Sequence, residues 1–366
     1  MALLILCDPN YRNNAWCDTK LKGIYDEAFR RRISVKLYTN IDTFKNDAAK
    51  LGKDSSVILL FNSMKYLSSV AEVLEDLAIH PILSVTESDI TFPRIFSQVC
   101  GDTDSPTKEL VDYLNSKGKR KIALIGASRY SAAALNKVEM LRRCVPPENY
   151  EVFYQKEKLT DSIEAFFKKR DEFDAAICID DNQGIFLIEY LLAHGAYNPD
   201  FYIISYGDTI ISRLYKIGLS TVSTGFYACG KAMVESHVHR EKYGWSSTMI
   251  RVNCEFKVRE SANGLASGEH TASTLDVSTP RIARLERMLF SCDLTDFKIL
   301  YGLICNYSYE RICDTCFLSP GAIKYRVRRL RLALGYQTRD EMISLLKDFI
   351  SKEKLLQHIA ETENAN

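Results

Sequence analysis

The sequence predicts an α/β fold with two lobes and parallel sheets, followed by a small all-α domain at the C-terminus. Three observations lead to this prediction. Apolar, strand-like runs alternate with amphipathic helical patterns along most of the chain, as in βαβ units. A segment of small and polar residues at 260–280 then ends the alternation. Only helical patterns follow it, and one of these helices is basic on its outer side and apolar on its inner side.

The alternation begins with an apolar strand at 2–7, which is ended by the turn-forming residues 8–10. Further strands are expected at 34–38, 56–61, 81–85, 121–125, 150–154, 175–179 and 202–205, with helices at 19–32, 67–77, 105–117, 131–143, 160–170, 182–194 and 227–239. Such alternation favours right-handed crossovers and parallel sheets with helices on both faces. The stretch is too long for one ordinary sheet, so two lobes are the economical arrangement.

Composition sets the broad class of the protein. The chain has 366 residues, of which 46% are hydrophobic and 26% charged, and its formal net charge is +1. These values are ordinary for a soluble globular protein. The eleven cysteines are scattered and suggest no disulfide framework, which favours a reducing cytoplasm. Because no apolar run approaches the ~20 residues that span a bilayer, no membrane partner is expected.

The domain boundaries follow from these patterns. We expect a two-lobed ligand-binding domain at 1–259, a flexible linker at 260–280, a helix-turn-helix domain at 281–352 and a polar tail at 353–366. The linker assignment rests on Ser, Thr, Ala and Gly, which leave almost nothing to bury. An amphipathic helix at 281–289 leads into the C-terminal domain.

The basic helix begins at Ser319-Pro320-Gly321, because serine is a good N-cap and proline is favoured at the first helical position. Its apolar residues are spaced by four, three and four positions and form one stripe: Ile323, Val327, Leu330 and Leu334. Five of the ten residues at 322–331 are Lys or Arg. A shorter helix starts near Ser308, and residues 317–318 connect the two, with Ile312 and Phe317 expected in the apolar packing.

Two helices joined in this way predict a helix-turn-helix, which places its second helix in the major groove of double-stranded DNA. The residues expected at the DNA are Ser319, Lys324, Tyr325, Arg326, Arg328, Arg329 and Arg331. The alternative is a solvated surface helix, which usually carries interleaved acids; none lies between Ile323 and Leu334. Residues 281–354 also hold 14 Lys and Arg against 9 Asp and Glu, an excess of five positive charges.

This region resembles the LuxR/GerE-type helix-turn-helix. The residues that carry the resemblance are Leu294-Thr295, Ile312, Leu318-Ser319-Pro320-Gly321, Ile323-Lys324, Leu334-Gly335 and Thr338-Arg339. Cys313, Ala322 and Arg326 depart from the residues usual in that family. A single short module gives weak affinity, so a homodimer on a palindromic site is expected.

The preceding region, 2–261, resembles the periplasmic-binding-protein-like (type I) effector domain of LacI/GalR repressors. The segments that carry the resemblance are 102–104, 119–126, 176–181, 203–209, 219–222, 230–232 and 258–261. One departure is architectural, since that family carries its DNA-binding helices at the N-terminus.

The resemblance implies a small-molecule effector, with a sugar as the first candidate, between the lobes and outside the carboxyl ends of the strands. The residues expected to contact it are Asp102, Asp180, Asp208, Trp16, Asn13, Arg12, Asn62 and Arg129. Asp102 and Asp180 stand where the family's polar ligand contacts lie, although an Asp at a strand end can equally cap the next helix. Gly207 stands where an acidic ligand residue is common, which leaves the chemistry of the effector open.

No pattern indicates catalysis, a cofactor or a metal. Cys313 and Cys316 form a CxxC pair, but no second pair or nearby His completes a tetrahedral set, so core cysteines are favoured. The sequence contains no Walker A, GxSxG or HExxH pattern. We therefore do not expect an enzyme.

The sequence predicts a ligand-responsive transcription regulator, and two alternatives stay open. One is a response regulator with a degenerate receiver-like N-terminal region, although the strand at 56–61 is followed by Asn62 rather than a phosphate-accepting Asp. The other is a small-molecule-processing enzyme with a DNA-binding appendage.

Overall fold

The computed structural model describes residues 2–12, 14–51, 55–61, 63–84, 96–244, 246–264, 270–273 and 278–364. The chain forms two compact units. The first contains residues 1–118, 126–162 and 222–256, and the second contains residues 119–125, 163–221 and 257–366. Among the described residues, no helix combines the length and the apolar character that crossing a membrane requires.

The first unit is built on a six-stranded sheet with the strand order β11-β5-β4-β3-β1-β2. Its strands are β1 (Leu3–Cys7), β2 (Val35–Tyr38), β3 (Ser56–Leu60), β4 (His80–Ser84), β5 (Ser97–Asp102) and β11 (Met249–Asn253). All of the strand pairs are parallel, with Ile5 opposite Ile58 and Ile58 opposite Ile82. The central strands are buried throughout, which explains their uninterrupted apolar sequences.

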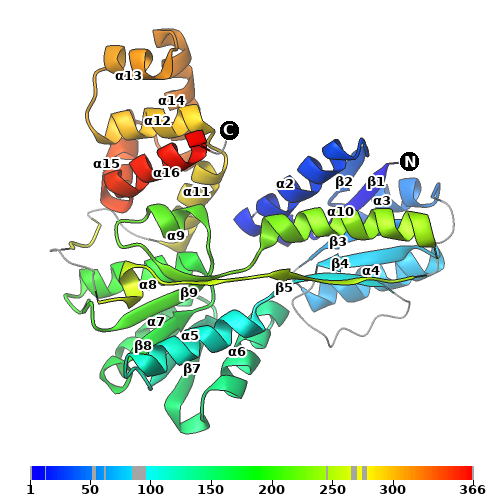
Figure 1. Cartoon of the computed structure of the whole chain (residues 1–366), viewed down its shortest axis with the longest axis horizontal. Coiled ribbons are helices and arrows are strands. Elements are labelled where there is room, and N and C mark those ends of the chain that lie inside the picture. The colour runs from blue at the N-terminus through cyan, green and yellow to red at the C-terminus, as the bar shows by residue number, and fades with distance from the viewer. Residues whose placement is uncertain are drawn as a thin grey trace. The chain divides into compact units, whose positions relative to one another are not determined.

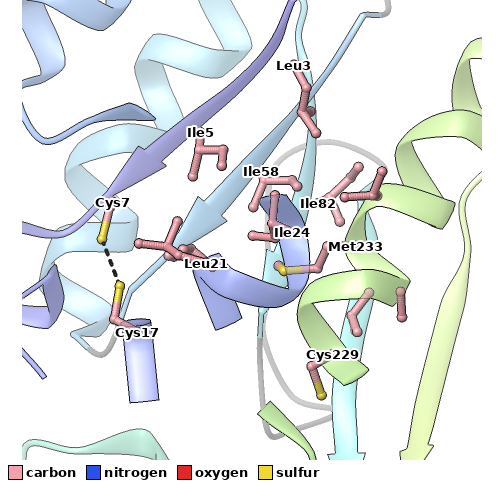
Figure 2. Packing of buried hydrophobic residues seen from close by; sticks show 14 of the residues in the cluster. Leu3, Ile5, Cys7, Cys17, Leu21, Ile24, Ile58, Ile82, Cys229 and Met233 are labelled. Atoms are coloured by element: carbon pink, nitrogen blue, oxygen red, sulfur yellow. Dashed lines mark hydrogen bonds between the residues drawn. The ribbon is translucent and has the colours of Figure 1, made fainter. Parts of the chain in front are cut away.

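Helices α1 (Pro9–Arg12), α2 (Ala15–Arg30), α3 (Ile41–Ala48), α4 (Met64–Asp76), α5 (Asp104–Ser116), α6 (Ala132–Cys144) and α10 (Phe226–Tyr243) belong to this unit. Figure 2 shows one core cluster, in which Ile5 and Ile58 of the sheet meet Ile24 of α2 and Met233 of α10. In a second cluster, Phe44 of α3 and residues of α4 pack against residues of the sheet. Two separate apolar clusters therefore hold helices against the sheet.

Helices α2 and α10 pack so closely that each needs a glycine at the contact. A Cβ on Gly23 would lie 2.1 Å from the carbonyl oxygen of Tyr227, and one on Gly230 would lie 2.1 Å from that of Lys20. Since both obstacles are backbone atoms, neither can move aside cheaply.

The second sheet has the strand order β12-β10-β9-β8-β6-β7. Its strands are β6 (Ile122–Ala127), β7 (Tyr150–Tyr154), β8 (Ala175–Cys178), β9 (Tyr202–Gly207), β10 (Ser220–Ser223) and β12 (Phe256–Lys257). The central pairs are parallel, with Leu124 opposite Ile177 and Ala176 opposite Ile203. Helices α7 (Leu159–Phe167), α8 (Asp181–Ala193) and α9 (Ile210–Leu214) accompany it, as do the short 3-10 turns η1 (Pro147–Asn149), η2 (Arg170–Glu172) and η3 (Glu260–Ala262).

Six helices end the chain: α11 (Thr279–Phe290), α12 (Leu294–Ile304), α13 (Tyr309–Cys316), α14 (Pro320–Leu334), α15 (Arg339–Phe349) and α16 (Lys352–Asn364). They appear from yellow to red in Figure 1 and belong to the second unit. The amide of Lys216 donates to the carbonyl of Phe349 over 2.8 Å, and the amide of Ser351 donates to Leu214 over 2.9 Å. The helical domain is thus hydrogen-bonded to the segment that follows α9.

The predicted fold class, two parallel-sheet α/β lobes with a small all-α C-terminal part, is confirmed. The strands β5, β10, β11 and β12 and the helices α1, α3, α9, α12 and α15 were not predicted individually from the sequence.

Two boundary expectations also differ from the structure. The expected polar tail is the helix α16, which buries Leu355 and Ile359 and packs against α12. The expected linker begins with residues that are held in place, because the hydroxyl of the buried Ser261 donates to the carbonyl of Ile203 over 2.6 Å. The rest of the expected linker is described only at residues 270–273 and 278–280.

Candidate functional sites

A pocket of about 370 Å³ in the first unit is the first candidate ligand site. It lies beside Asp102, the last residue of β5, and its lining combines side chains from β5, α6 and β11 with Tyr154 of β7. Its charged lining residues are Asp102, Asp104, Glu139, Arg142, Arg143 and Arg251. The volume lies within the range of small-molecule sites. Carboxylates beside guanidinium groups and a tyrosine can pair with both the acceptors and the donors of a polar ligand.

Two of the expected ligand residues lie in or beside this pocket. Asp102 is half-buried and accepts a long hydrogen bond of 3.4 Å from Ser105. Arg129 places its guanidinium carbon 3.9 Å from the centre of the Tyr154 ring, which lines the pocket. Glu139 forms ion pairs of 3.2 Å with Arg142 and 3.3 Å with Arg143, so part of the charge is already compensated.

The structure does not place Arg12 or Trp16 in the lining of this pocket. Arg12 pairs with Asp18 at 2.5 Å, and Trp16 packs against the ring of Phe226 with 6.1 Å between ring centres. Both assignments stay predictions. Asn13 and Asn62 lie outside the described residues.

Asp180 follows β8 and caps α8, accepting a hydrogen bond of 2.8 Å from the amide of Gln183. The capping role that was weighed against ligand binding is thus present, although it occupies only part of the carboxylate's capacity. The neighbouring Asp181 was not singled out from the sequence. It is buried and accepts hydrogen bonds from Ser205 at 2.5 Å, the amide of Thr209 at 2.7 Å and Thr221 at 2.8 Å. Asp181 therefore joins the carboxyl ends of β8 and β9 to β10.

Asp208 is surrounded by cations. Its carboxylate lies 2.5 Å from Arg259, 3.1 Å from Lys257 and 3.4 Å from Arg213. Burial alone would raise the pKa of Asp208, but Arg213 and Arg259 outweigh it and lower the pKa below its ordinary value. The backbone at Asp208 has a φ of 54°, a conformation uncommon outside glycine. Since three cations engage this carboxylate, its assignment as a ligand residue stays a prediction.

The two helices that were predicted to form the helix-turn-helix, α13 and α14, each begin at a serine N-cap. Ser308 caps α13 by accepting from the amide of Arg311 over 3.2 Å, and Ser319 caps α14 by accepting from the amide of Ala322 over 3.3 Å. The apolar stripe of α14 is buried as predicted: Ile323, Val327, Leu330 and Leu334. Gly335, with a φ of 78°, ends the helix in the left-handed conformation typical of a C-cap.

The basic residues of α14 fall into two groups. Lys324, Tyr325 and Arg328 are exposed. Within the described residues, the side chains of Lys324 and Arg328 have no hydrogen-bond or ion-pair partner. Arg326, Arg329 and Arg331 are engaged. The partners of Arg326 and Arg329 could not be predicted from α14 itself, because they are acids of another helix.

Asp293 and Asp296 of α12 hold the engaged arginines. Arg326 lies 2.8 Å from both carboxylates, and Arg329 pairs with Asp296. Burial would raise the pKa of Asp293, but the hydrogen bonds from Arg326 and the backbone of Asp296, together with the charges of Arg326 and Arg329, outweigh it and lower the pKa. Arg331 instead donates to the carbonyls of Tyr336, at 3.0 Å, and Gln337. The two carboxylates of α12 thus hold Arg326 and Arg329 of α14 in place.

The turn between α13 and α14 differs from the expectation in one residue. Phe317 was expected in the apolar packing with Ile312, but its side chain is 92% exposed and its φ is 53°. Cys313 and Cys316 are half-buried, and burial raises the pKa of Cys316. In the described part of the chain, no group of three His, Cys, Asp or Glu side chains could hold a metal ion.

Comparison with known proteins identifies the fold of the two lobes. No protein-family model matches the sequence, and the search of curated proteins finds no match. Solved structures do match. A LacI family transcriptional regulator from Enterococcus faecium with bound ribose superposes with a TM-score of 0.60 and 16% identity, over 72% of this chain and 99% of that one. The two lobes have the fold of the LacI-family effector domain.

Two further structures agree with this LacI-like fold. The transcriptional regulator CelR in complex with cellobiose gives a TM-score of 0.60 at 17% identity, over 71% of this chain and 84% of that one. The Lac repressor bound to ONPG gives 0.56 at 16% identity, over 72% and 82%. At such identities the likeness shows the fold alone.

Proposed function

We propose that this protein is a ligand-responsive transcription regulator, in which LacI-like lobes bind a small molecule and the C-terminal helix-turn-helix binds double-stranded DNA. The observation that carries the proposal is the exposed face of α14. Lys324, Tyr325 and Arg328 are free to reach DNA while the opposite stripe of the helix is buried.

The DNA contacts divide by what each side chain can do. Lys324, Tyr325 and Arg328 are available for base edges in the major groove, where Arg and Lys pair with guanine. Arg326 and Arg329, steadied by Asp296, and Arg331, steadied by backbone carbonyls, are assigned to the phosphates. The amide of Gly321 at the start of α14, next to Ser319, offers a further phosphate contact, because Pro320 has no N–H and the amides of Ala322 and Ile323 already donate to Ser319.

The effector is proposed to bind at the carboxyl ends of the parallel strands, with Asp102 as its main polar contact in the pocket of the first unit. Asp180, at the carboxyl end of β8, stays a predicted contact. The mixed charges and the Tyr154 ring of the pocket beside Asp102 suit a molecule rich in hydroxyls. The bound ribose and cellobiose of the similar structures make small sugars the first compounds to test.

The effector can regulate DNA binding if it binds one of two conformations of the protein more tightly than the other. Asp181 and Thr209, at the ends of β8 and β9, lie next to α9, and the helical domain is hydrogen-bonded at the end of α9. A change at the ligand edge of the second sheet therefore has a short route to the DNA-binding helices. A homodimer on a palindromic site is part of the proposal.

The response-regulator alternative accounts for only one sheet, and the second six-stranded sheet has no place in it. The enzyme alternative requires a reactive constellation. The similar structures are transcription regulators, which supports the regulator instead.

The test is selection of fragments from pooled genomic DNA by the full-length protein across a salt series. The variant Lys324→Ala/Arg328→Ala should lose the enrichment, whereas Lys156→Ala/Lys158→Ala, which removes two exposed charges of the first unit, should keep it. A wild type that enriches no fragment, or a Lys324/Arg328 variant that enriches the same fragments equally, would overturn the proposal.

A further inference from the structure

Helix α11, which leads into the DNA-binding helices, carries a buried glutamate at the ligand edge of the second sheet. Glu286 is 3% exposed, and α11 packs against α8 and α9. Its Oε2 accepts a hydrogen bond of 2.8 Å from the amide nitrogen of Asn182. Asn182 directly follows Asp180 and Asp181, the residues at the carboxyl end of β8.

The polar atoms around Glu286 lack donors. Glu286 Oε1, Asn182 Oδ1 and Gln183 Oε1 are all buried without a hydrogen-bond partner in the described structure. All three are oxygens that accept unless protonated. A buried polar atom without a partner costs about 1–3 kcal/mol, and more where charge is involved. The arrangement therefore calls for at least one additional proton.

Hydrogen bonds from Asn182 and Thr209 lower the pKa of Glu286, but no cation among the groups that face it compensates a negative charge. Asp181 and Asp180 of α8 are both acidic. The hydroxyl of Thr209, at the start of α9, donates to Asp181 over 2.8 Å, and Arg213 of α9 pairs with Asp208. From α14, on which α11 also packs, Arg331 donates to backbone carbonyls, and Arg284 of α11 lies toward Gly335. Within the described residues no Lys or Arg pairs with Glu286.

We propose that Glu286 and Asn182 form a proton-dependent latch between α11 and the start of α8. With a proton on Oε1, the carboxyl group donates to Asn182 Oδ1 while Oε2 still accepts from Asn182 Nδ2. One proton thereby satisfies two of the three buried acceptors. Without it, Glu286 Oε1 is a buried charge and Asn182 Oδ1 has no donor, so α11 is held less firmly.

The direction of the pH effect follows from the same contacts. Burial, the largest cause, raises the pKa of Glu286 to about 7; the Asn182 hydrogen bond opposes the rise, and Asp181 and Asp180 add to it. A latched Glu286 keeps its proton up to about pH 7, whereas a released one loses it near 4.5. Latching is therefore strongest at low pH and weakens as the pH rises toward 7. Because one pKa unit is a factor of ten, the full effect is roughly three-hundredfold in the latching equilibrium.

The consequence for regulation rests on the proposed function, but the latch itself does not require DNA. Because α11 precedes α12 directly, release of α11 would loosen the DNA-binding helices at the point where they meet the ligand edge. Protonation and effector binding would then act on the same contact.

The test is hydrogen–deuterium exchange of the full-length protein without DNA, read on peptides from α11 and corrected for the intrinsic pH dependence of exchange. Between about pH 5.5 and about pH 8.5, opening of α11 should increase at least tenfold in the wild type. Glu286→Gln, whose amide can make both hydrogen bonds to Asn182 at any pH, should stay protected throughout. The surface control Glu361→Gln should behave as the wild type.

Wild-type protection that does not change with pH, or an unchanged pH dependence in Glu286→Gln, would overturn the latch. If that variant does not fold, carboxyl 13C titration of the wild type decides, because a glutamate titrating near pH 7 is expected and all glutamates titrating below about pH 5.5 would contradict it. DNA selection at both pH values separates the two proposals. If the protein still enriches fragments although the exchange experiment contradicts the latch, the proposal of a transcription regulator stands and only the latch is wrong.

Discussion

Arg326 of α14 lies 2.8 Å from the carboxylate of Asp296, a residue of α12 that is wholly buried. Arg329 shares the same carboxylate. One acid from the preceding helix thus orients two of the basic residues assigned to DNA, while Lys324 and Arg328 beside them stay free. Helix α14 thus carries one set of cations that is held by α12 and one set that is unpaired in the described structure.

Asp296→Ala should destabilise the protein by about 2 kcal/mol, between the values typical of exposed and of buried ion pairs, because both arginines are partly exposed. Urea unfolding measures the change. Asp314→Ala, which removes an exposed acid from α13, is the control and should stay within about 0.5 kcal/mol of the wild type. Equal stability of the two variants would mean that Asp296 does not hold the arginines.

Gly23→Ala and Gly230→Ala should each destabilise the first unit by ~3 kcal/mol or more, since the added methyl meets backbone only 2.1 Å away. Gly321→Ala is a suitable control because its Cβ would have open space, with Ser319 Oγ 3.9 Å away, and alanine favours a helix. Thermal unfolding compares the three. A Gly23 variant as stable as the control would contradict the close packing of α2 and α10.

Phe317→Gly should stabilise the protein by about 1 kcal/mol, because the residue has a φ of 53° and glycine adopts this conformation without steric cost. The ring is 92% exposed, so little burial is lost. Denaturant unfolding tests this, with Phe317→Ala as the comparison that removes the ring but keeps the Cβ. Loss of stability in the glycine variant would show that the ring packs in solution.

Asp208→Asn should cost about 2 kcal/mol near neutral pH, because Arg259 and two further cations lose their partner. The pKa of Asp208 is lowered in the folded protein, so this stabilisation is present above the ordinary value of 3.8 and is lost as the pH falls below it. The urea midpoints of wild type and variant should therefore differ at about pH 6 and converge toward about pH 3. Asp200→Asn, an exposed acid, should show no difference at either pH.

The elements that could be predicted from the sequence are those whose own side chains reveal whether they are buried. Strands such as Leu3–Cys7 and Ser56–Leu60 are buried on both sides and read as continuous apolar runs. The strand Ser97–Asp102 was missed because it contains Gln98, Gly101 and Asp102, and the strand Met249–Asn253 was missed because it lies at the sheet edge and is only half-buried. Their strand character comes from pairing with each other, which periodicity does not reveal.

The candidate sites divide in the same way. The buried stripe of α14 follows from helical spacing, so it was predictable residue by residue. The partners of Arg326 and Glu286 are distant in sequence, in α12 and α8, and no local pattern connects them. Asp181 and Asp208 likewise obtain their roles from loops that the fold brings together.

The most direct test of the central claim is the affinity of the protein for a selected genomic fragment, measured with and without a panel of small sugars. We predict that at least one sugar changes the Kd by tenfold or more, that the fragment changes the sugar's Kd by the same factor, and that Asp102→Ala abolishes the effect while leaving DNA affinity in the absence of sugar unchanged. A sugar that binds the lobes with no change in DNA affinity, or an Asp102→Ala variant that responds as the wild type does, would contradict the account.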